Sequence, residues 1–180
     1  MAPLEKTLSI LGPAGAGKDT ALGFLLFKLG GIDLFTAQRF ERDGIKLYSD
    51  AVKDLQSRGL QLSFYTPNYH LVVSSGSSKV DCVILVIPTD SANVDFEKEL
   101  VEAAGFSKSI IVLINKMDTV GWSEEVFRAS VKSLGPATEG IFVIPFCALK
   151  GDNVLELSSK SLWYKNATLL EALETELSSS

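Results

Sequence analysis

The chain has 180 residues, of which 46% are hydrophobic and 22% are charged, and its formal net charge is −5. This length and composition predict a single globular domain over residues 1–177 and a disordered tail at residues 178–180. The acidic balance excludes an overall basic surface, so we expect no strong intrinsic binding to nucleic acid.

The cysteine content and the hydrophobic runs indicate in which cellular compartment the protein resides. Cys82 and Cys147 lie far apart and lack the spacing of metal ligands, which favours reduced thiols in an intracellular compartment. No apolar run approaches the length of a membrane span, and the first residues show no signal-peptide pattern. We therefore expect a cytoplasmic protein with no membrane partner.

A glycine-rich segment near the start lies between an apolar run at residues 7–11 and a helical apolar pattern that ends at Leu29. In that context a glycine-rich loop is typical of phosphate binding, because its backbone amides and the helix N-terminus both face an anion. Lys18 supplies a point charge for β- and γ-phosphates. The predicted phosphate-binding residues are Gly12, Gly15, Ala16, Gly17, Lys18, Asp19 and Thr20.

Asp19 departs from the phosphate-loop pattern, which has Ser or Thr after the lysine so that a hydroxyl ligates Mg²⁺. A carboxylate is also a hard oxygen ligand, so Asp19 is a candidate Mg²⁺ ligand. The alternative is a carboxylate that only stabilises the first turn of the helix.

The middle of the chain alternates between predicted helices and strands. Residues 34–58 predict one or two helices with a break at Gly44, and residues 60–64 and 69–73 predict a β-hairpin. A polar loop follows at residues 74–78. The apolar residues 82–87 and 110–114 predict central parallel strands that are covered on both faces.

The remaining elements complete an α/β pattern. One helix is predicted at residues 95–104, a second begins after its capping residue Ser123, and a third lies at the C-terminus. A strand is predicted at residues 141–146 and a loop at residues 151–166. The alternation predicts a mostly parallel sheet with one antiparallel hairpin edge and helices on both faces.

A second motif, Asn115-Lys116-Met117-Asp118, follows a buried strand at the edge of the sheet where ligands bind. An Asn-Lys-x-Asp run in this place is typical of guanine recognition by GTPases. The Asp118 carboxylate would accept hydrogen bonds from the guanine N1–H and exocyclic amine, Asn115 would tie loops together, and the stem of Lys116 would lie over the base. The loop Cys147-Ala148-Leu149 follows the last strand at the same edge.

Together these motifs resemble the G domain of translational GTPases, a P-loop NTPase fold, and in particular elongation factor 1-alpha and its release-factor and ribosome-rescue relatives. Asn115-Lys116-Met117-Asp118 is identical to the family form, Gly30-Gly31-Ile32-Asp33 matches the segment after the first helix, and residues 148–153 resemble the fifth motif. Cys147 replaces a serine. The resemblance implies GTP or GDP as ligand, Mg²⁺ as its metal if Asp19 serves as ligand, and a ribosome-associated or other protein partner.

The departures from the family cluster at the predicted γ-phosphate end. Gln61 stands where the family has a threonine that senses Mg²⁺ and γ-phosphate. The family's Asp-x-Pro-Gly-His motif has no counterpart, and the serine loop at residues 74–77 takes its place with the following helix deleted. His70, the one histidine, is predicted to be a strand residue rather than a displaced catalyst. We therefore assign no catalytic residue and expect weak or absent hydrolysis.

Three hypotheses remain open. The favoured one is a guanine-nucleotide-binding scaffold, a pseudo-GTPase derived from a translation factor. The second is an active GTP-hydrolysing elongation or rescue factor domain in which Asp19 and other groups replace the lost ones. The third is a phosphotransferase resembling nucleoside monophosphate kinases, with Thr20 as the loop hydroxyl, but those enzymes use several arginines and this hypothesis leaves residues 115–118 unexplained.

Overall fold

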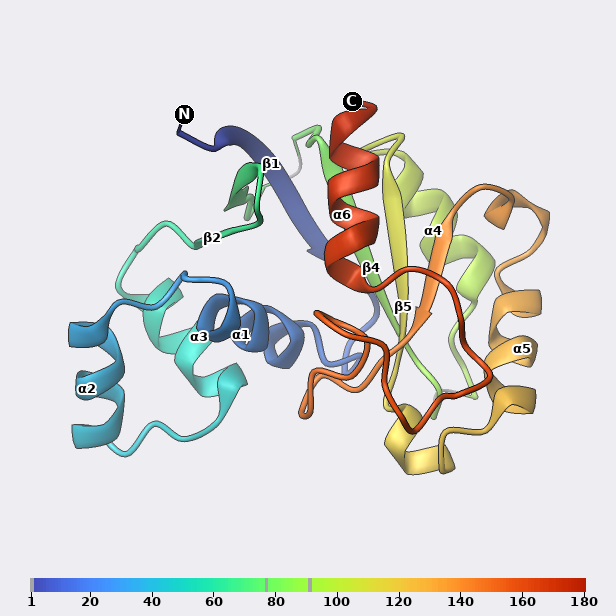
Figure 1. Ribbon diagram of the computed structural model, residues 1–180, viewed down its shortest axis with the longest axis horizontal. Helices are drawn as coiled ribbons and strands as arrows, with labels where there is room; N and C mark the ends of the chain where they lie inside the picture. The colour runs from blue at the N-terminus through green and yellow to red at the C-terminus, as the bar shows by residue number, and fades with distance from the viewer. Residues whose placement is uncertain (1, 77, 91) are drawn as a thin grey trace.

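The computed structural model describes residues 2–76, 78–90 and 92–180 (Figure 1). Within these residues, six strands form one sheet in the order β2-β3-β1-β4-β5-β6. The strands are β1 (Leu4–Leu11), β2 (Ser63–Tyr65), β3 (Tyr69–Val73), β4 (Cys82–Pro88), β5 (Ile110–Asn115) and β6 (Phe142–Pro145). Only β2 and β3 pair in antiparallel fashion among the described strands, so the predicted parallel sheet with one hairpin edge is confirmed.

The helices lie between the strands in the predicted order. They are α1 (Lys18–Lys28), α2 (Leu34–Arg42), α3 (Tyr48–Ser57), α4 (Phe96–Ala104), α5 (Glu124–Ser133) and α6 (Leu169–Ser178), with short 3-10 turns η1 (Met117–Val120) and η2 (Pro136–Thr138). Ser123 caps α5 as predicted, because its side chain accepts a hydrogen bond from the amide of Val126. No helix in the described parts of the chain has the length and apolar character needed to cross a membrane.

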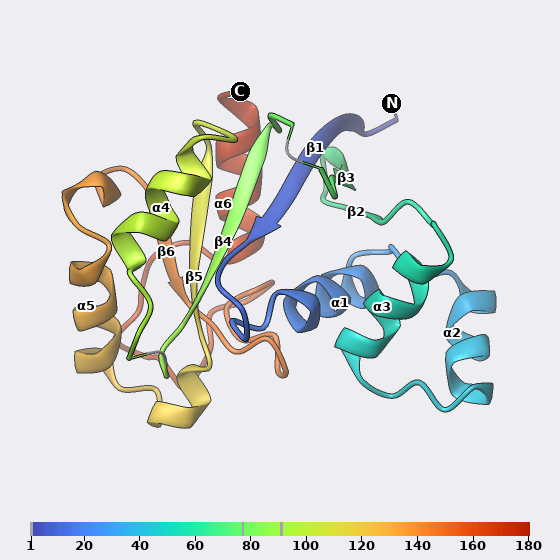
Figure 2. The same ribbon diagram turned by 180° about the vertical axis from the view of Figure 1, so that it is seen from behind.

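The central strands β4 and β5 carry two hydrophobic cores, one on each face of the sheet. On β4, Ile84 and Val86 belong to the core shared with α1 and α6, whereas Val83 and Leu85 belong to the core shared with α4 and α5. Figure 1 shows α6 in front of the sheet, and the reverse view in Figure 2 shows α4 in front of the other face. Coverage on both faces explains why these strands are continuously apolar.

Helix α3 packs tightly on α1, and α2 lies at the outer end of the molecule (Figures 1 and 2). The close approach requires Gly23, because a Cβ at this position would lie 2.4 Å from the carbonyl oxygen of Tyr48. Phe40 is the one buried residue of α2, and Arg39 of α2 pairs with Asp54 of α3. The two helices are therefore attached to the sheet mainly through α1.

Strand β1 begins at Leu4, three residues before the predicted apolar run, and β6 is one residue shorter at each end than predicted. Two further boundaries differ for a reason that the hydrogen bonds show. Strand β2 begins at Ser63 rather than at Leu60, because the Leu60 amide donates a hydrogen bond to the Leu55 carbonyl and so ends α3. Leu60 is consequently exposed, whereas Phe64 is buried. At the C-terminus α6 includes Ser178, which we expected in the tail, and the Ser178 hydroxyl donates to the carbonyl of Thr175.

Candidate nucleotide-binding site

The predicted ligand-binding loops gather where the parallel strands β1, β4, β5 and β6 end, at the lower edge of the sheet in Figure 1. This is the edge at which open α/β sheets bind their ligands. The loop after β1 leads into α1, and the loops after β5 and β6 lie beside it.

The glycine-rich loop crosses the end of β4 at very short range. Gly12 has a φ of 144°, and a Cβ there would lie 2.2 Å from the carbonyl oxygen of Val86. Gly17, with a φ of 94°, precedes α1, so the first amides of this helix have no intrahelical partner and face the loop. The Lys18 ammonium donates hydrogen bonds to the carbonyl oxygens of Gly12 and Pro13 and so lies across the loop.

Asn115 at the end of β5 joins three loops. Its Nδ2 donates to the carbonyl oxygen of Ala16 at 2.8 Å, and its Oδ1 accepts from the amide of Ala148 at 3.0 Å. The side chain is buried, with 2% of the residue exposed. A buried amide that meets partners on both sides fixes the spacing of the loops after β1, β5 and β6, which is the role predicted for this residue.

These loops enclose a cleft of about 340 Å³, which we call the base-end cleft. Eight residues predicted for the site line it: Gly17, Thr20, Asn115, Lys116, Asp118, Cys147, Ala148 and Leu149. Asp90 and Thr119, which were not predicted from the sequence, line it as well. Asp90 lies just beyond the carboxyl end of β4, so the general rule for ligand sites in α/β sheets would have been a signal for it.

Asp118 and Cys147 face each other in the base-end cleft. Asp118 is exposed, and no ion pair among the described residues includes it. Burial raises the pKa of the Cys147 thiol, and the nearby Asp118 carboxylate raises that pKa as well. The thiol is therefore protonated near neutral pH, and its S–H is a weaker hydrogen-bond donor than a serine hydroxyl would be.

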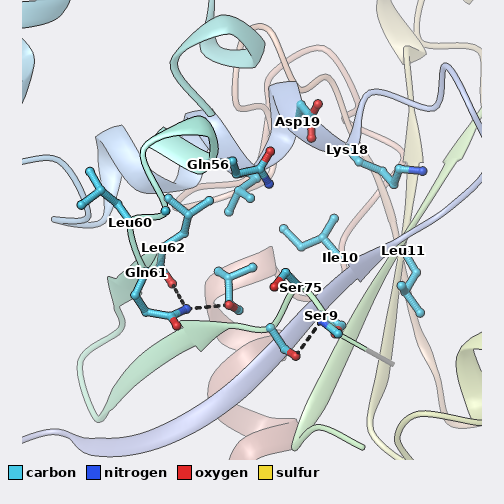
Figure 3. A pocket seen from close by; sticks show the side chains of 15 residues that line it. Ser9, Ile10, Leu11, Lys18, Asp19, Gln56, Leu60, Gln61, Leu62 and Ser75 are labelled. Atoms are coloured by element: carbon cyan, nitrogen blue, oxygen red, sulfur yellow. Dashed lines mark hydrogen bonds between the residues drawn. The ribbon is translucent and has the colours of Figure 1, made fainter. Parts of the chain in front are cut away.

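Lys18 and Asp19 line a second cleft of about 540 Å³, which we call the phosphate-end cleft (Figure 3). In this view Gln61 lies on the opposite side of the cleft from Asp19. The Gln61 side-chain amide donates to the carbonyl oxygen of Val73 at 2.8 Å, so it is bonded to the end of β3. Asp19 is the one carboxylate among the described residues that line this cleft.

The serine loop borders the same cleft with Ser74, Ser75 and Gly76, whereas Ser77 lies outside the described residues. The amide of Ser74 donates to the Leu8 carbonyl at 2.7 Å, which holds the start of the loop against β1. No group of three or more histidine, cysteine, aspartate or glutamate side chains in the described ranges is arranged to bind a metal ion. Gly12, Gly15 and Ala16 belong to the loop between the two clefts and line neither.

His70 lines neither cleft and lies in the strand position predicted for it. It pairs in register with Glu5 near the start of β1, and its ring stacks on Tyr65 with 4.6 Å between ring centroids. Six residues of strand separate Glu5 from the end of β1, a distance of about 20 Å at the usual rise. The histidine therefore does not reach the phosphate loop.

Comparison with known proteins agrees with this geometry. No protein-family model matches the chain. It is 32% identical to elongation factor 1-alpha of Plasmodium falciparum over 217 residues, which cover 95% of this chain and 49% of that protein. Sup35 complexed with GMPPNP is similar in structure, with a TM-score of 0.71 and 24% identity over 96% of this chain and 45% of that one. The Saccharomyces cerevisiae Ski7 GTPase-like domain, bound to GDP and inorganic phosphate, has a TM-score of 0.71 and 19% identity over 98% of this chain and 50% of that one.

The sheet order and the three joined loops define the fold of a P-loop G domain. Within that class, the chain is a translational GTPase-like G domain homologous to elongation factor 1-alpha. The chain spans about half the length of the curated relatives it matches.

Proposed function

We propose that the chain binds GTP or GDP and acts as a nucleotide-binding scaffold that hydrolyses GTP very slowly or not at all. The observation that carries the proposal is the buried Asn115 side chain, which holds Ala16 and Ala148 together and leaves the Asp118 carboxylate open to the base-end cleft. A carboxylate in this place accepts from guanine N1–H and its exocyclic amine, a pair of donors that adenine lacks. Sup35, a protein of the same fold, is known in complexes with GMPPNP and GDP.

The phosphates would lie on the free amides at the start of α1 and on the Lys18 ammonium. Mg²⁺ is usually held by one or two carboxylates together with phosphate oxygens and water, so Asp19, which lines the phosphate-end cleft, fits as a metal ligand. A bound Mg²⁺ would neutralise part of the phosphate charge. Without it, Asp19 would repel the phosphates.

The residues of the phosphate-end cleft support the proposal that hydrolysis is slow. Phosphoryl transfer depends on positioning of the attacking water and on neutralisation of charge. The Gln61 amide is bonded to the end of β3, and His70 lies near the start of that strand and does not line the cleft. Among the described residues that line the cleft, Asp19 is the one carboxylate, and no histidine is present to orient a water as in the family motif.

The phosphotransferase hypothesis receives no support from the arginines. Arg39 and Arg58 pair with Asp54, and Arg128 pairs with Glu124 on α5. Neither described cleft at the ligand-binding edge is lined by an arginine. Kinases that clamp two nucleotides need such side chains on the phosphates.

Homology to a translation factor points to a ribosomal or ribosome-associated protein as partner, and to the cytoplasm as location. Co-sedimentation of the purified chain with ribosomes in the presence of GDP, and separately of GTP, would test this partner. Equal recovery in the pellet with and without ribosomes would argue against it.

The test of nucleotide function is titration calorimetry with GTP and ATP, followed by single-turnover hydrolysis of bound GTP. We expect tighter binding of GTP than of ATP and negligible turnover. Equal affinity for the two nucleotides would refute guanine recognition. Turnover at rates typical of active GTPases would refute the scaffold and support the hydrolysing factor domain instead.

A further inference from the structure

The lysine of the guanine motif is held in an unusual backbone conformation by the loop after β4. Lys116 has a φ of 65°, in the left-handed region that residues other than glycine rarely adopt. The Thr89 amide donates to the Asn115 carbonyl at 3.1 Å, and the Thr89 hydroxyl donates to the Lys116 carbonyl at 3.2 Å. These contacts tie the loop after β4 to the base-binding loop.

Asp90 then binds the far end of the same lysine. The Lys116 ammonium lies 2.9 Å and 3.2 Å from the two carboxylate oxygens of Asp90. Asp90, Lys116 and Asp118 all line the base-end cleft, so one ammonium lies in a cleft with two carboxylates. It pairs with Asp90, and Asp118 has no cationic partner among the described residues.

We propose that Asp90 is a positioning residue for guanine recognition. By binding the Lys116 ammonium, it keeps this charge from pairing with Asp118, whose carboxylate then remains free for the base. The same contact holds the aliphatic stem of Lys116 against the cleft wall that Asp90 occupies. The inference rests on the proposed function, and it adds a residue outside the Asn-Lys-x-Asp motif to the specificity of the site.

The hydrogen bond from the exocyclic amine of guanine to Asp118 can be measured separately, because hypoxanthine lacks that amine and keeps the N1–H. The ratio of GDP affinity to IDP affinity therefore reports how freely Asp118 accepts from the amine. In Asp90→Asn the released ammonium pairs with Asp118, and we expect this ratio to fall by about five- to tenfold, somewhat less than for the complete loss of a hydrogen bond to a charged group.

The experiment is titration calorimetry with GDP and IDP on the unmutated chain, Asp90→Asn, Asp90→Glu and Asp50→Asn. Asp90→Glu keeps the charge and should restore most of the ratio. Asp50→Asn is the matched control, because Asp50 forms an exposed pair with Lys53 on α3, outside both clefts. Thermal unfolding without nucleotide checks that the variants fold equally.

A double variant separates positioning from a merely structural role. In a Lys116→Met background there is no ammonium to restrain, so adding Asp90→Asn should leave the GDP-to-IDP ratio unchanged. An unaltered ratio in Asp90→Asn alone, with a GDP preference present in the unmutated chain, overturns the inference. Equal binding of GDP and IDP by the unmutated chain instead refutes guanine recognition itself, and with it the role of Asp90.

Discussion

Gly17 leaves the space that the Asn115 side chain occupies: a Cβ on Gly17 would lie 2.4 Å from Asn115 Nδ2. The phosphate loop and the base-binding loop are thus in contact through Gly17, which lacks a side chain, and Asn115, whose side-chain amide bonds to both neighbouring loops. Nucleotide affinity and folding stability should depend on this contact together.

Gly17→Ala should destabilise the chain by about 2–4 kcal/mol, because it adds left-handed strain and displaces Asn115 from its buried hydrogen bonds. Gly15→Ala is the matched control: Gly15 also has a positive φ, of 76°, but a Cβ there meets nothing within 4 Å. It should cost only about 1–2 kcal/mol of strain. Urea unfolding without nucleotide measures both. Equal losses for the two variants would show that the contact with Asn115 is unimportant.

Asp118→Asn should exchange the base preference. An amide in place of the carboxylate no longer accepts from both guanine donors, but it donates to the additional carbonyl of xanthine. We expect GDP affinity to fall by at least about tenfold, as for the loss of a charged hydrogen-bond partner, and XDP affinity to rise. Competition of GDP and XDP against a fluorescent nucleotide measures this. The assignment of Asp118 to the base would be wrong if GDP affinity stayed unchanged.

Lys18→Ala should weaken GDP binding by about 1.5–3 kcal/mol, the usual range for a hydrogen bond to a charged group. Guanosine, which has no phosphate, should bind equally to the variant and the unmutated chain. Lys28→Ala is the control, because Lys28 lies in the last turn of the same helix, outside both clefts. Unchanged GDP affinity in Lys18→Ala would mean that the glycine-rich segment is only a turn.

Asp19→Ser tests the metal assignment by the dependence of GDP affinity on Mg²⁺. If Asp19 ligates the metal, as we propose, the serine variant should lose part of the affinity gained on adding Mg²⁺, because a hydroxyl is a weaker ligand than a carboxylate. Calorimetric titration in Mg²⁺ and in EDTA gives the comparison. A gain in Mg²⁺-dependent affinity would show instead that the carboxylate only repels the phosphates.

Stability should fall at alkaline pH because of Cys82 in β4. Burial, together with the nearby Glu176 and Asp81 carboxylates, raises the pKa of this thiol to about 12. The unfolded thiol ionises from about pH 9 while the folded one stays protonated, so the folded state binds more protons and the free energy of unfolding decreases as pH rises. Urea unfolding at pH 8 and pH 10 should show a smaller decrease in Cys82→Ala. An equal decrease in both proteins would contradict this contribution.

The fold could be predicted because, along most of the chain, the spacing of apolar residues agrees with the capping residues and glycines that end the helices and strands. The continuous apolar runs of β4 and β5 follow from burial on both faces, and the caps and glycines place most helix ends within a few residues. The start of β2 could not be predicted in the same way. Leu60 and Leu62 alternate as a strand would, but a hydrogen bond from the Leu60 amide back to α3 removes Leu60 from the sheet.

The residues of the candidate site likewise fall into those that the sequence predicts and those that only the structure reveals. Residues in short motifs were found because their spacing along the chain carries the chemistry. Asp90 belongs to no motif, and its pairing with Lys116 joins segments 26 residues apart, so the three-dimensional structure is needed to see it. The bonding of the Gln61 side chain to Val73 likewise depends on the hairpin register, which the polar sequence around it does not specify.

The position of α2 divides the domain into parts of different local stability. This helix buries Phe40 alone, whereas every residue of β4 and β5 is buried. Opening α2 exposes little apolar surface, so its amides should exchange hydrogen with solvent through local fluctuations, while those of β4 and β5 exchange only when the whole domain unfolds. A nucleotide bound at the opposite end of α1 would slow exchange in the sheet and leave α2 almost unaffected, because ligand binding raises only the free energy of openings that destroy its site.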